Sequence, residues 1–545
     1  MKFEIYDTDI LGRIGEINLN GKKLKTPNLF PVIHPYRNIL DLEFLKKIGV
    51  HALFTNSYTL YQNEKIRNKV LKKGLHDYLE FDGFIATDSG AFQQYMYNES
   101  NIEINAQEIE LFQEKINSNF PVILDIPVQL DDDYDIAKNK ILINIKRAKE
   151  NIERRSNSEC SWFGPIHGGR YFNLLKQSCL AMNKLDFNVY AIGGLVKAYL
   201  EYRFNLAIKI LLNVKKSIRP DKPIHMFGLG LPQFFALAIA CGCDLMDSAA
   251  YILYAKEKRY FSLSTGTSKL DELHEFPCSC PICNRYNPKE VRNMGENMQV
   301  KLLAKHNLYL SFSELRTVRQ AIKEGNLWEL VEQRIRAHPN LVEAAKIMYN
   351  NAKYFECFEK IYKKHGRLLS SIESVNRPIF KRYSKRLMSR HRIPEKIKFL
   401  IILPEVDTTL QNSPFLTESI KNIYSNDLIS SDLIQIMFTS SVFGVLPLEW
   451  SYTFPMGQYE VSNLFLEGDL LWKNFETIVR RYFKINSQYF KKCGLFAPKN
   501  YENQYCENVE LSTDNFIYRL YDLLKPYFNG NLHISPKIDE LIAQF

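Results

Sequence analysis

The sequence predicts an α/β protein whose main domain is a (β/α)8 barrel, or TIM barrel, followed by smaller α+β domains. Over residues 25–250, short apolar runs typical of strands alternate with longer amphipathic stretches typical of helices. Alternating strands and helices imply a parallel sheet, and eight repeats are the number that closes a barrel. An open, doubly wound sheet is the alternative fold for the same pattern.

Eight apolar runs define the repeat, and each ends in glycine or in another small or polar residue. In chain order they are LFPVIHP (29–35), HALFTNSY (51–58), FIATDSG (84–90), VILDIP (122–127), WFGPIHGG (162–169), VYAIGGL (189–195), IHMFGLG (224–230) and CDLMDS (243–248). In a barrel, the carboxyl ends of the strands meet at the mouth that holds the active site. The residues expected there are Asn56, Asp88, Asp125, His167, Gly193, Gly194 and Asp247.

Three aspartates at three strand ends are the main indication of chemistry in this region. A single aspartate in such a position is commonly a helix N-cap. Ionised carboxylates repel one another, so gathering Asp88, Asp125 and Asp247 at one mouth costs free energy unless function requires it. The pattern therefore favours a chemical role for these residues over a capping role.

Three of the ten cysteines lie within eight residues, in the sequence FPCSCPIC. The C-x-C-x-x-C spacing lets the thiolates of Cys278, Cys280 and Cys283 converge on one point, and zinc readily takes Cys₃His ligands in a tetrahedron. His306, on a helical stretch further along the chain, is the expected fourth ligand, and His274 is the alternative. We expect one structural zinc ion per chain. The other seven cysteines have apolar neighbours, which is typical of buried core residues.

Length and composition limit the size, partners and location of the protein. A chain of 545 residues is too long for one core. Its formal net charge of +10 is a weak indication of an anionic partner such as nucleic acid. The start, MKFEIYDTDI, lacks the features of a secretory signal, and no apolar stretch reaches the roughly 18 residues of a membrane helix. We expect a cytoplasmic protein with no membrane partner.

Changes in pattern along the chain suggest three domains. We expect a barrel with its zinc site at 1–360, an α/β domain at 361–460 and a second small α+β domain at 461–545. The middle domain begins with a basic stretch, 377–398, which holds nine lysines and arginines against one acid, Glu395. Such a stretch is either a solvated linker or a surface that contacts phosphates.

Several motifs together resemble one family, the tRNA-guanine transglycosylases. DSGAFQ from Asp88 is similar to the family's DSG-small-FQ signature, and HGG from His167 and AIGGL from Ala191 resemble its two glycine loops. The cysteine cluster with His306 resembles its zinc site. The segment 225–262, which contains DSAAY, resembles the archaeal branch in particular. The resemblance is strong over the barrel domain and weak beyond it.

The resemblance implies a base exchange on tRNA. Guanine at position 15 of the dihydrouridine arm would be replaced by 7-cyano-7-deazaguanine (preQ0), the entry step to archaeosine. Breaking an N-glycosidic bond leaves positive charge on the ribose C1′, which a carboxylate can capture covalently. By motif position, Asp247 would be this nucleophile and Asp88 the general acid and then base. Two successive displacements place such carboxyl groups about 5 Å apart.

The resemblance also implies how the bases are held. Asp125 would accept hydrogen bonds from the edge that guanine and preQ0 share, and Phe92 would stack on the flat base. The target nucleotide must be flipped out of the folded arm. The remaining implied contacts are the backbone of Gly193, Gly194 and Leu195, for the exocyclic groups of the base, and Ser89 and Asn56, for the ribose or for support of the site.

The chain departs from the family pattern in three places, the minor one being Ala91, which replaces a second glycine of the bacterial motif. Most members have glutamine where His167 stands; its imidazole can still bond a base carbonyl oxygen, or it packs behind the glycine loop. Archaeal members usually end in an RNA-binding PUA domain, and the end of this chain shows no such pattern. Either that domain is absent or a separate PUA-domain protein supplies it, as a partner alongside tRNA, preQ0 and guanine. We also expect a homodimer.

Three other functions fit parts of the pattern. One is that of the paralogue archaeosine synthase, but Glu405 stands where that enzyme has a cysteine. The second is a non-catalytic tRNA-binding subunit, and the third is the bacterial exchange at the anticodon wobble guanine. The aspartates at the strand ends argue against a pure binder, since binding alone requires none of them.

Overall fold

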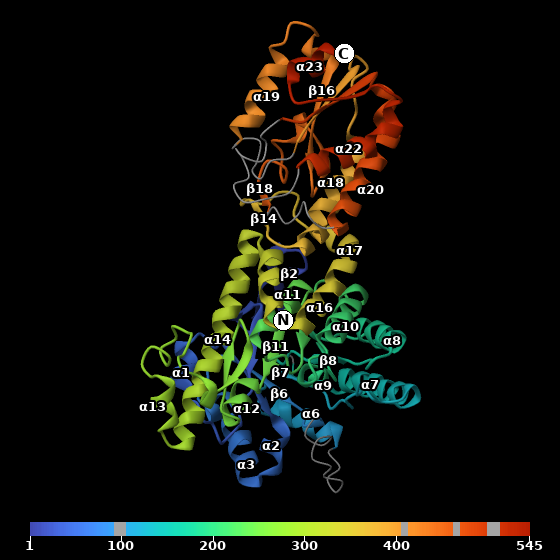
Figure 1. Cartoon of the computed structure of the whole chain (residues 1–545). Coiled ribbons are helices and arrows are strands. Elements are labelled where there is room, and N and C mark those ends of the chain that lie inside the picture. Colours follow the sequence, from blue (N-terminus) through green and yellow to red (C-terminus); the bar gives the residue numbers. More distant parts are fainter. Residues whose placement is uncertain (92–104, 158, 405–412, 462–468, 499–512) are drawn as a thin grey trace. The chain divides into compact units, whose positions relative to one another are not determined.

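The chain folds as two units, Met1–Asn350 and Asn351–Phe545. The computed structural model describes residues 1–91, 105–157, 159–404, 413–461, 469–498 and 513–545. Both units combine strands and helices, so the mixed α/β class is confirmed (Figure 1). No helix among the described residues is both long and apolar enough to cross a membrane.

An antiparallel sheet precedes the repeat. It consists of β1 (Lys2–Asp9), β2 (Gly12–Leu19) and β3 (Lys22–Thr26), in the order β1-β2-β3. Ile17 and Leu24 of this sheet belong to the same buried cluster as Phe30 and Phe54, so the sheet covers one end of the strand core that follows.

Eight parallel strands form the centre of the first unit. They are β4 (Asn28–Pro31), β5 (Ala52–Asn56), β6 (Phe84–Asp88), β7 (Phe120–Pro121), β8 (Phe163–Ile166), β9 (Val189–Ile192), β10 (Ile224–Met226) and β11 (Leu245–Ser248). Seven of them fall on the apolar runs of the sequence, and β7 ends just before the run VILDIP (122–127).

The strands pair in two sheets, ordered β4-β11-β10-β9-β8 and β5-β6-β7. Two isolated parallel bridges, Val32 with Phe54 and Val122 with Phe163, join the edges of these sheets. Each of the eight strands therefore has a parallel neighbour on both sides, and all their carboxyl ends lie at one edge.

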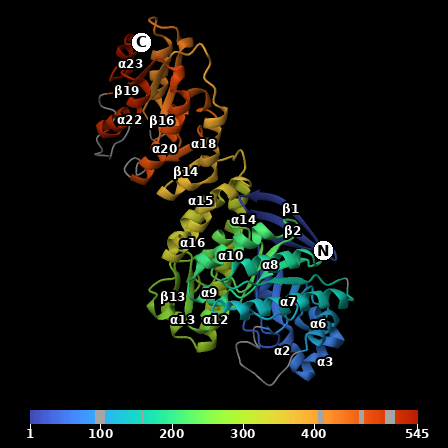
Figure 2. The same cartoon turned by 90° about the vertical axis from the view of Figure 1, so that its right-hand side faces the viewer.

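Helices separate the strands and, in both views, lie outside them (Figures 1 and 2). In chain order they are α1 (Leu42–Lys47), α2 (Ser57–Gln62), α3 (Glu64–Lys73), α4 (Leu75–Leu79), α6 (Ala106–Lys115), α7 (Tyr134–Arg154), α8 (Phe172–Asn183), α9 (Val196–Leu200), α10 (Phe204–Ser217), α11 (Pro232–Ala240) and α12 (Ala250–Lys256). Helix α11, PQFFALAIA, is buried along its whole length because α14 and α15 pack over it.

The elements after β11 complete the first unit. They are β12 (Arg259–Ser262), β13 (Gly266–Lys269), α13 (Pro288–Arg292), α14 (Glu296–Glu324), α15 (Leu327–Arg334) and α16 (Pro339–Asn350). The long helix α14 packs against α12 and β12, and the cysteine-rich loop lies between β13 and α13.

The second unit is built on one five-stranded sheet, ordered β17-β16-β15-β19-β20. Its strands are β15 (Phe399–Leu403), β16 (Ile434–Ser440), β17 (Gly444–Pro447), β19 (Lys492–Phe496) and β20 (Leu532–Ser535), and a separate pair joins β14 (Arg367–Leu369) to β18 (Tyr459–Val461). Its helices are α17 (Ala352–Glu356), α18 (Pro378–Arg390), α19 (Pro414–Tyr424), α20 (Asp469–Asn486), α22 (Thr513–Phe528) and α23 (Ile538–Ala543).

The domain boundary expected at residue 460 falls inside this sheet. Strand β15 pairs with β16 on one side and with β19 on the other, so strands from 361–460 and from 461–545 share one core. The boundary expected at residue 360 lies close to the division between the two units at Asn350.

Candidate active site and metal centre

A cavity of about 320 Å³ opens at the carboxyl ends of the parallel strands in the first unit. Seven of the residues expected from the sequence line it, from six different strand ends: Asn56, Asp88, Asp125, His167, Gly193, Gly194 and Asp247. Ser89 and Leu195 are buried beside it, and Ser89 donates a hydrogen bond to the carbonyl of Ile123 at 3.1 Å. Phe92 lies outside the described residues.

Asp88 ends β6 directly beside Asn56, which ends β5. The Asn56 amide donates to Asp88 Oδ2 at 3.1 Å, while its own carbonyl oxygen caps α2 by accepting from the backbone N–H of Thr59. Burial, and then the charge of Asp125, raise the pKa of Asp88 to about 7. The Asp88 carboxyl can therefore hold or release a proton near neutral pH, as a general acid or base requires.

Asp125 is held by a buried histidine. His167 Nε2 lies 2.5 Å from Asp125 Oδ2, and His167 Nδ1 is buried with no partner among the described residues. The imidazole packs beneath Gly193, where a Cβ would lie only 2.2 Å from His167 Cε1. His167 lines the cavity with Nε2 at Asp125 and Nδ1 buried, and its two expected roles, packing behind the glycine loop or bonding a base, both stay predictions.

Asp247 is held in the same way by a second buried histidine. His225 Nε2 lies 2.7 Å from Asp247 Oδ1, and the backbone N–H of Gly228 donates to the same oxygen at 3.2 Å. No described side chain or backbone N–H contacts Oδ2 of Asp247 in a hydrogen bond, so this oxygen is available for chemistry.

The imidazole of His225 is fully buried among phenylalanine rings, the nearest being those of Phe163 and Phe227, each at 5.0 Å between ring centroids. Its Nδ1 has no partner among the described residues. The proton must therefore be on Nε2, where it meets Asp247. Sequence reasoning missed His225 because a histidine inside the apolar run IHMFGLG looks like a core residue. The available signal was that a buried histidine requires a polar partner.

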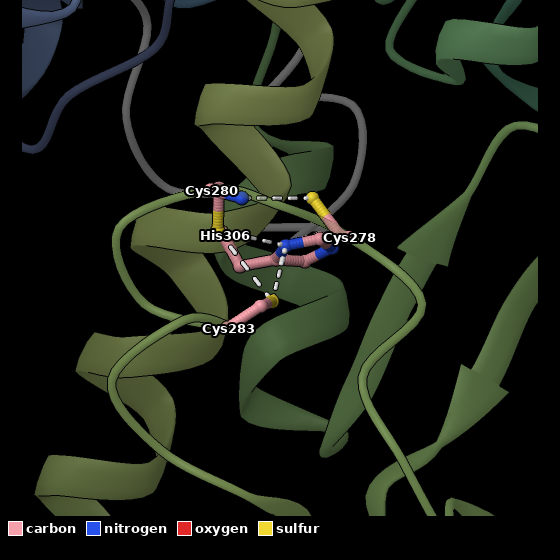
Figure 3. Close-up of side chains that lie close together, drawn as sticks. All are labelled: Cys278, Cys280, Cys283 and His306. Atoms are coloured by element: carbon pink, nitrogen blue, oxygen red, sulfur yellow. Dashed lines mark hydrogen bonds between the residues drawn. The ribbon is translucent and has the colours of Figure 1, made fainter.

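The four expected metal ligands converge on one point (Figure 3). Cys278, Cys280 and Cys283 come from the loop before α13, and His306 comes from α14. All four ligand atoms lie within 4.8 Å of one another. The alternative ligand His274 is exposed and does not belong to the cluster.

The cluster fits a tetrahedral metal ion. Sγ of Cys280 lies 3.5 Å from Sγ of Cys283 and 3.5 Å from Nδ1 of His306. Metal–sulfur bonds of about 2.3 Å and metal–nitrogen bonds of about 2.0 Å in a tetrahedron require separations of about 3.5–3.8 Å. His306 Nε2 lies 3.0 Å from the carbonyl of Phe261, which fixes the tautomer that leaves Nδ1 free for a metal.

Comparisons with known proteins agree with this geometry. A family model described as queuine tRNA-ribosyltransferase matches residues 8–340. The chain belongs to this family. The tRNA-guanine(15) transglycosylase of Methanocaldococcus jannaschii is 39% identical over 474 residues, which cover 85% of this chain and 69% of the relative.

Two further relatives carry the same name. The protein of Methanococcus maripaludis strain C6 is 36% identical, over 94% of this chain and 76% of its own length. That of Pyrococcus furiosus is 41% identical, over 73% of this chain and 67% of its own. The match to the queuine tRNA-ribosyltransferase family spans both the strand-end cavity and the cysteine cluster.

The raised pKa of Asp88 predicts a pH-dependent stability. The folded protein keeps a proton on Asp88 that the unfolded chain releases above pH ~4, so this residue lowers the free energy of unfolding as the pH rises from about 4 to 7. Asp88→Asn should therefore gain on the order of 4 kcal/mol over the parent at pH 8 and almost nothing at pH 4. Urea unfolding at both pH values measures this difference; equal gains at both would contradict it.

Proposed function

We propose that this chain replaces guanine-15 of tRNA with preQ0, as a tRNA-guanine(15) transglycosylase. The observation that supports this most is the group of three carboxylates at the wall of one cavity, in a chain whose relatives bear that name. At about 320 Å³, the cavity is within the range of small-molecule sites and could take a flipped nucleotide. A tRNA substrate also fits the expected cytoplasmic location.

We further propose that β4 to β11 close into a (β/α)8 barrel. The two bridges that join the sheet edges support this, because they leave no strand of the eight with an unpaired side. In such a barrel the carboxyl ends of the strands form the active-site face. Asp88, Asp125 and Asp247 would then face one mouth by topology.

Asp247 would be the nucleophile. His225 and Gly228 hold Oδ1, so Oδ2 would attack C1′ of the target ribose as the bond from C1′ to the guanine nitrogen breaks. The product of this step is a covalent tRNA–enzyme ester, and the electron pair of the broken bond leaves with guanine. The reverse sequence with preQ0 re-forms the C1′–nitrogen bond and frees Asp247.

Asp88 would supply and then remove the proton. With a pKa of about 7, a protonated Asp88 can donate to the departing guanine, and the resulting carboxylate can accept a proton from preQ0. Asp125, whose Oδ2 is held by His167, would accept hydrogen bonds from the edge that both bases share. The backbone of Gly194 and Leu195 would contact the exocyclic groups.

The remaining expected contacts are assigned as follows. Asn56 acts through Asp88, to which its amide donates. Ser89 supports the strand end beside Asp125. Gly193 provides the space that the His167 ring fills. Stacking by Phe92 stays a prediction, since this residue lies outside the described residues.

We propose that the cysteine cluster binds one structural zinc ion. Three thiolates and one imidazole match the ligand set and the ligand separations of such a site. Four protein ligands leave no open position for a reactive water, so the ion would stabilise the loop against α14 and take no part in the exchange.

The partners would be tRNA, guanine and preQ0, with a homodimer and a separate PUA-domain protein as further expectations. A non-catalytic tRNA-binding subunit and an archaeosine synthase-like enzyme are the alternatives. Glu405, which stands where the synthase has a cysteine, lies outside the described residues. An exchange assay separates the proposed enzyme from both alternatives, neither of which exchanges the base.

The proposed activity predicts that labelled guanine enters an unmodified tRNA transcript at position 15, and that preQ0 then competes with it. Asp247→Asn should abolish exchange, by at least about 10³-fold, because an amide cannot form the ester with C1′. It should still bind the transcript. A denaturation-resistant tRNA adduct with the parent and also with Asp247→Asn would identify another nucleophile.

The contact between His225 and Asp247 predicts a role in positioning. His225→Leu leaves Asp247 without its buried donor and should lower kcat about 100-fold, with KM for tRNA unchanged, since a misplaced nucleophile loses alignment with C1′. His225→Gln keeps a side-chain N–H and should recover much of this loss. If His225→Leu turns over like the parent, the histidine is only a core residue.

The ligand geometry predicts one zinc ion per chain in freshly purified, reduced protein. Cys283→Ser should lose the ion and lower the melting temperature, because metal binding contributes directly to folding. Cys357→Ser is the matched control, since this exposed cysteine lies outside the cluster and should keep the ion. Metal analysis and thermal unfolding of both variants test the assignment, and a parent without zinc would refute it.

A further inference from the structure

The basic stretch 377–398 folds as helix α18 with the residues around it, and one face of the helix borders a second cavity of about 310 Å³. All of the residues around this cavity belong to the second unit. Ile379, Arg382, Tyr383, Arg386 and Arg390 form one wall, at the spacing of a single helix face. Trp450, Phe454 and Met456 belong to the opposite wall.

The three arginines of this face have different surroundings. Arg382 is fully used inside the protein: it donates to the carboxylate of Glu356, the last residue of α17, at 2.8 Å, and to the carbonyls of Glu356, Glu359 and Lys360. It is therefore a structural residue. At this residue, neither of the two interpretations of the basic stretch, a solvated linker or a surface that contacts phosphates, applies.

Arg386 and Arg390 have no hydrogen-bond or ion-pair partner among the described residues. Arg386 is half-buried, and burial together with the charges of Arg382 and Arg390 lowers its pKa. The nearby acids are already engaged: Glu356 pairs with Arg382, and Glu449 accepts from His391 at 2.8 Å. Like charges in one row on a helix repel each other, so this arrangement favours a bound anion.

The aromatic wall adds a second kind of contact. Trp450 is half-buried; it meets Tyr383 and His391 edge to face, at 6.0 and 5.5 Å between ring centroids. An aromatic ring next to guanidinium groups is the combination that binds a nucleotide through its phosphate and its base.

We propose that Arg386, Arg390 and Trp450 of the second unit form a second tRNA subsite, in which the two arginines bind two neighbouring backbone phosphates and Trp450 stacks on an adjoining base. This inference rests on the proposed tRNA substrate. The subsite would contribute affinity and not chemistry, because none of its groups can act on a glycosidic bond. It would also be insensitive to base identity, since a phosphate has no sequence information.

The test is direct binding of a labelled tRNA transcript to the full-length chain across a range of salt concentrations. Arg386→Gln combined with Arg390→Gln should weaken binding about 10-fold near physiological salt, and should reduce the slope of log K against log salt by about 1.5, since two phosphate contacts are lost. Trp450→Leu should weaken binding with the slope unchanged. At saturating tRNA, kcat for guanine exchange should equal that of the parent.

Lys396→Gln is the matched control, because Lys396 is an exposed cation of the same basic stretch that pairs with Asp432. It should bind like the parent. If the parent neither binds nor exchanges tRNA, the proposed function fails. If the parent does both and the double arginine variant binds with the same affinity and slope, the second subsite is refuted. Arg390→Gln alone, at an exposed position, gives about half of the slope change and serves if the double variant is unstable.

Discussion

The repulsion among three carboxylates at the wall of one cavity is the constraint on which the site depends. Asp88, Asp125 and Asp247 come from strand ends that the parallel topology brings together. The fold resolves the repulsion unequally. Asp125 and Asp247 each receive an imidazole N–H, whereas Asp88 receives the weaker donors of a neutral amide and a backbone N–H. Burial, and then the charge of Asp125, raise the pKa of Asp88, and its two weaker donors offset this only in part, so Asp88 can hold a proton near neutral pH.

Much of this arrangement could be predicted from the sequence, because it follows from local pattern and parallel topology. The apolar runs predict the positions of the strands. Because parallel strands end at one edge, they also predict that Asp88, Asp125 and Asp247 lie close together. The metal cluster was equally local: C-x-C-x-x-C fixed three ligands, and only the choice between His306 and His274 required the path of the chain.

The features that the sequence did not predict depend on contacts between residues that are far apart in the chain. His167 contacts Asp125, which lies 42 residues earlier in the chain, and Arg382 contacts Glu356, which belongs to the preceding helix. No sequence motif links the two residues of either pair. A domain boundary at residue 460 does not fit the pairing of β19 with β15, because these strands lie on either side of that residue in the chain. Pairing of that kind is set by the shared core and leaves no mark in composition.

The two buried histidines explain how the site keeps its carboxylates in place. Each leaves one ring nitrogen buried without a partner among the described residues, which costs about 1–3 kcal/mol for each. Apolar side chains of similar size would avoid that cost. They would also leave Asp125 and Asp247 without their donors and free to rotate toward each other or toward Asp88. The fold therefore gives up stability in the layer beneath the cavity, and in return Asp247 keeps one oxygen fixed and the other oxygen free.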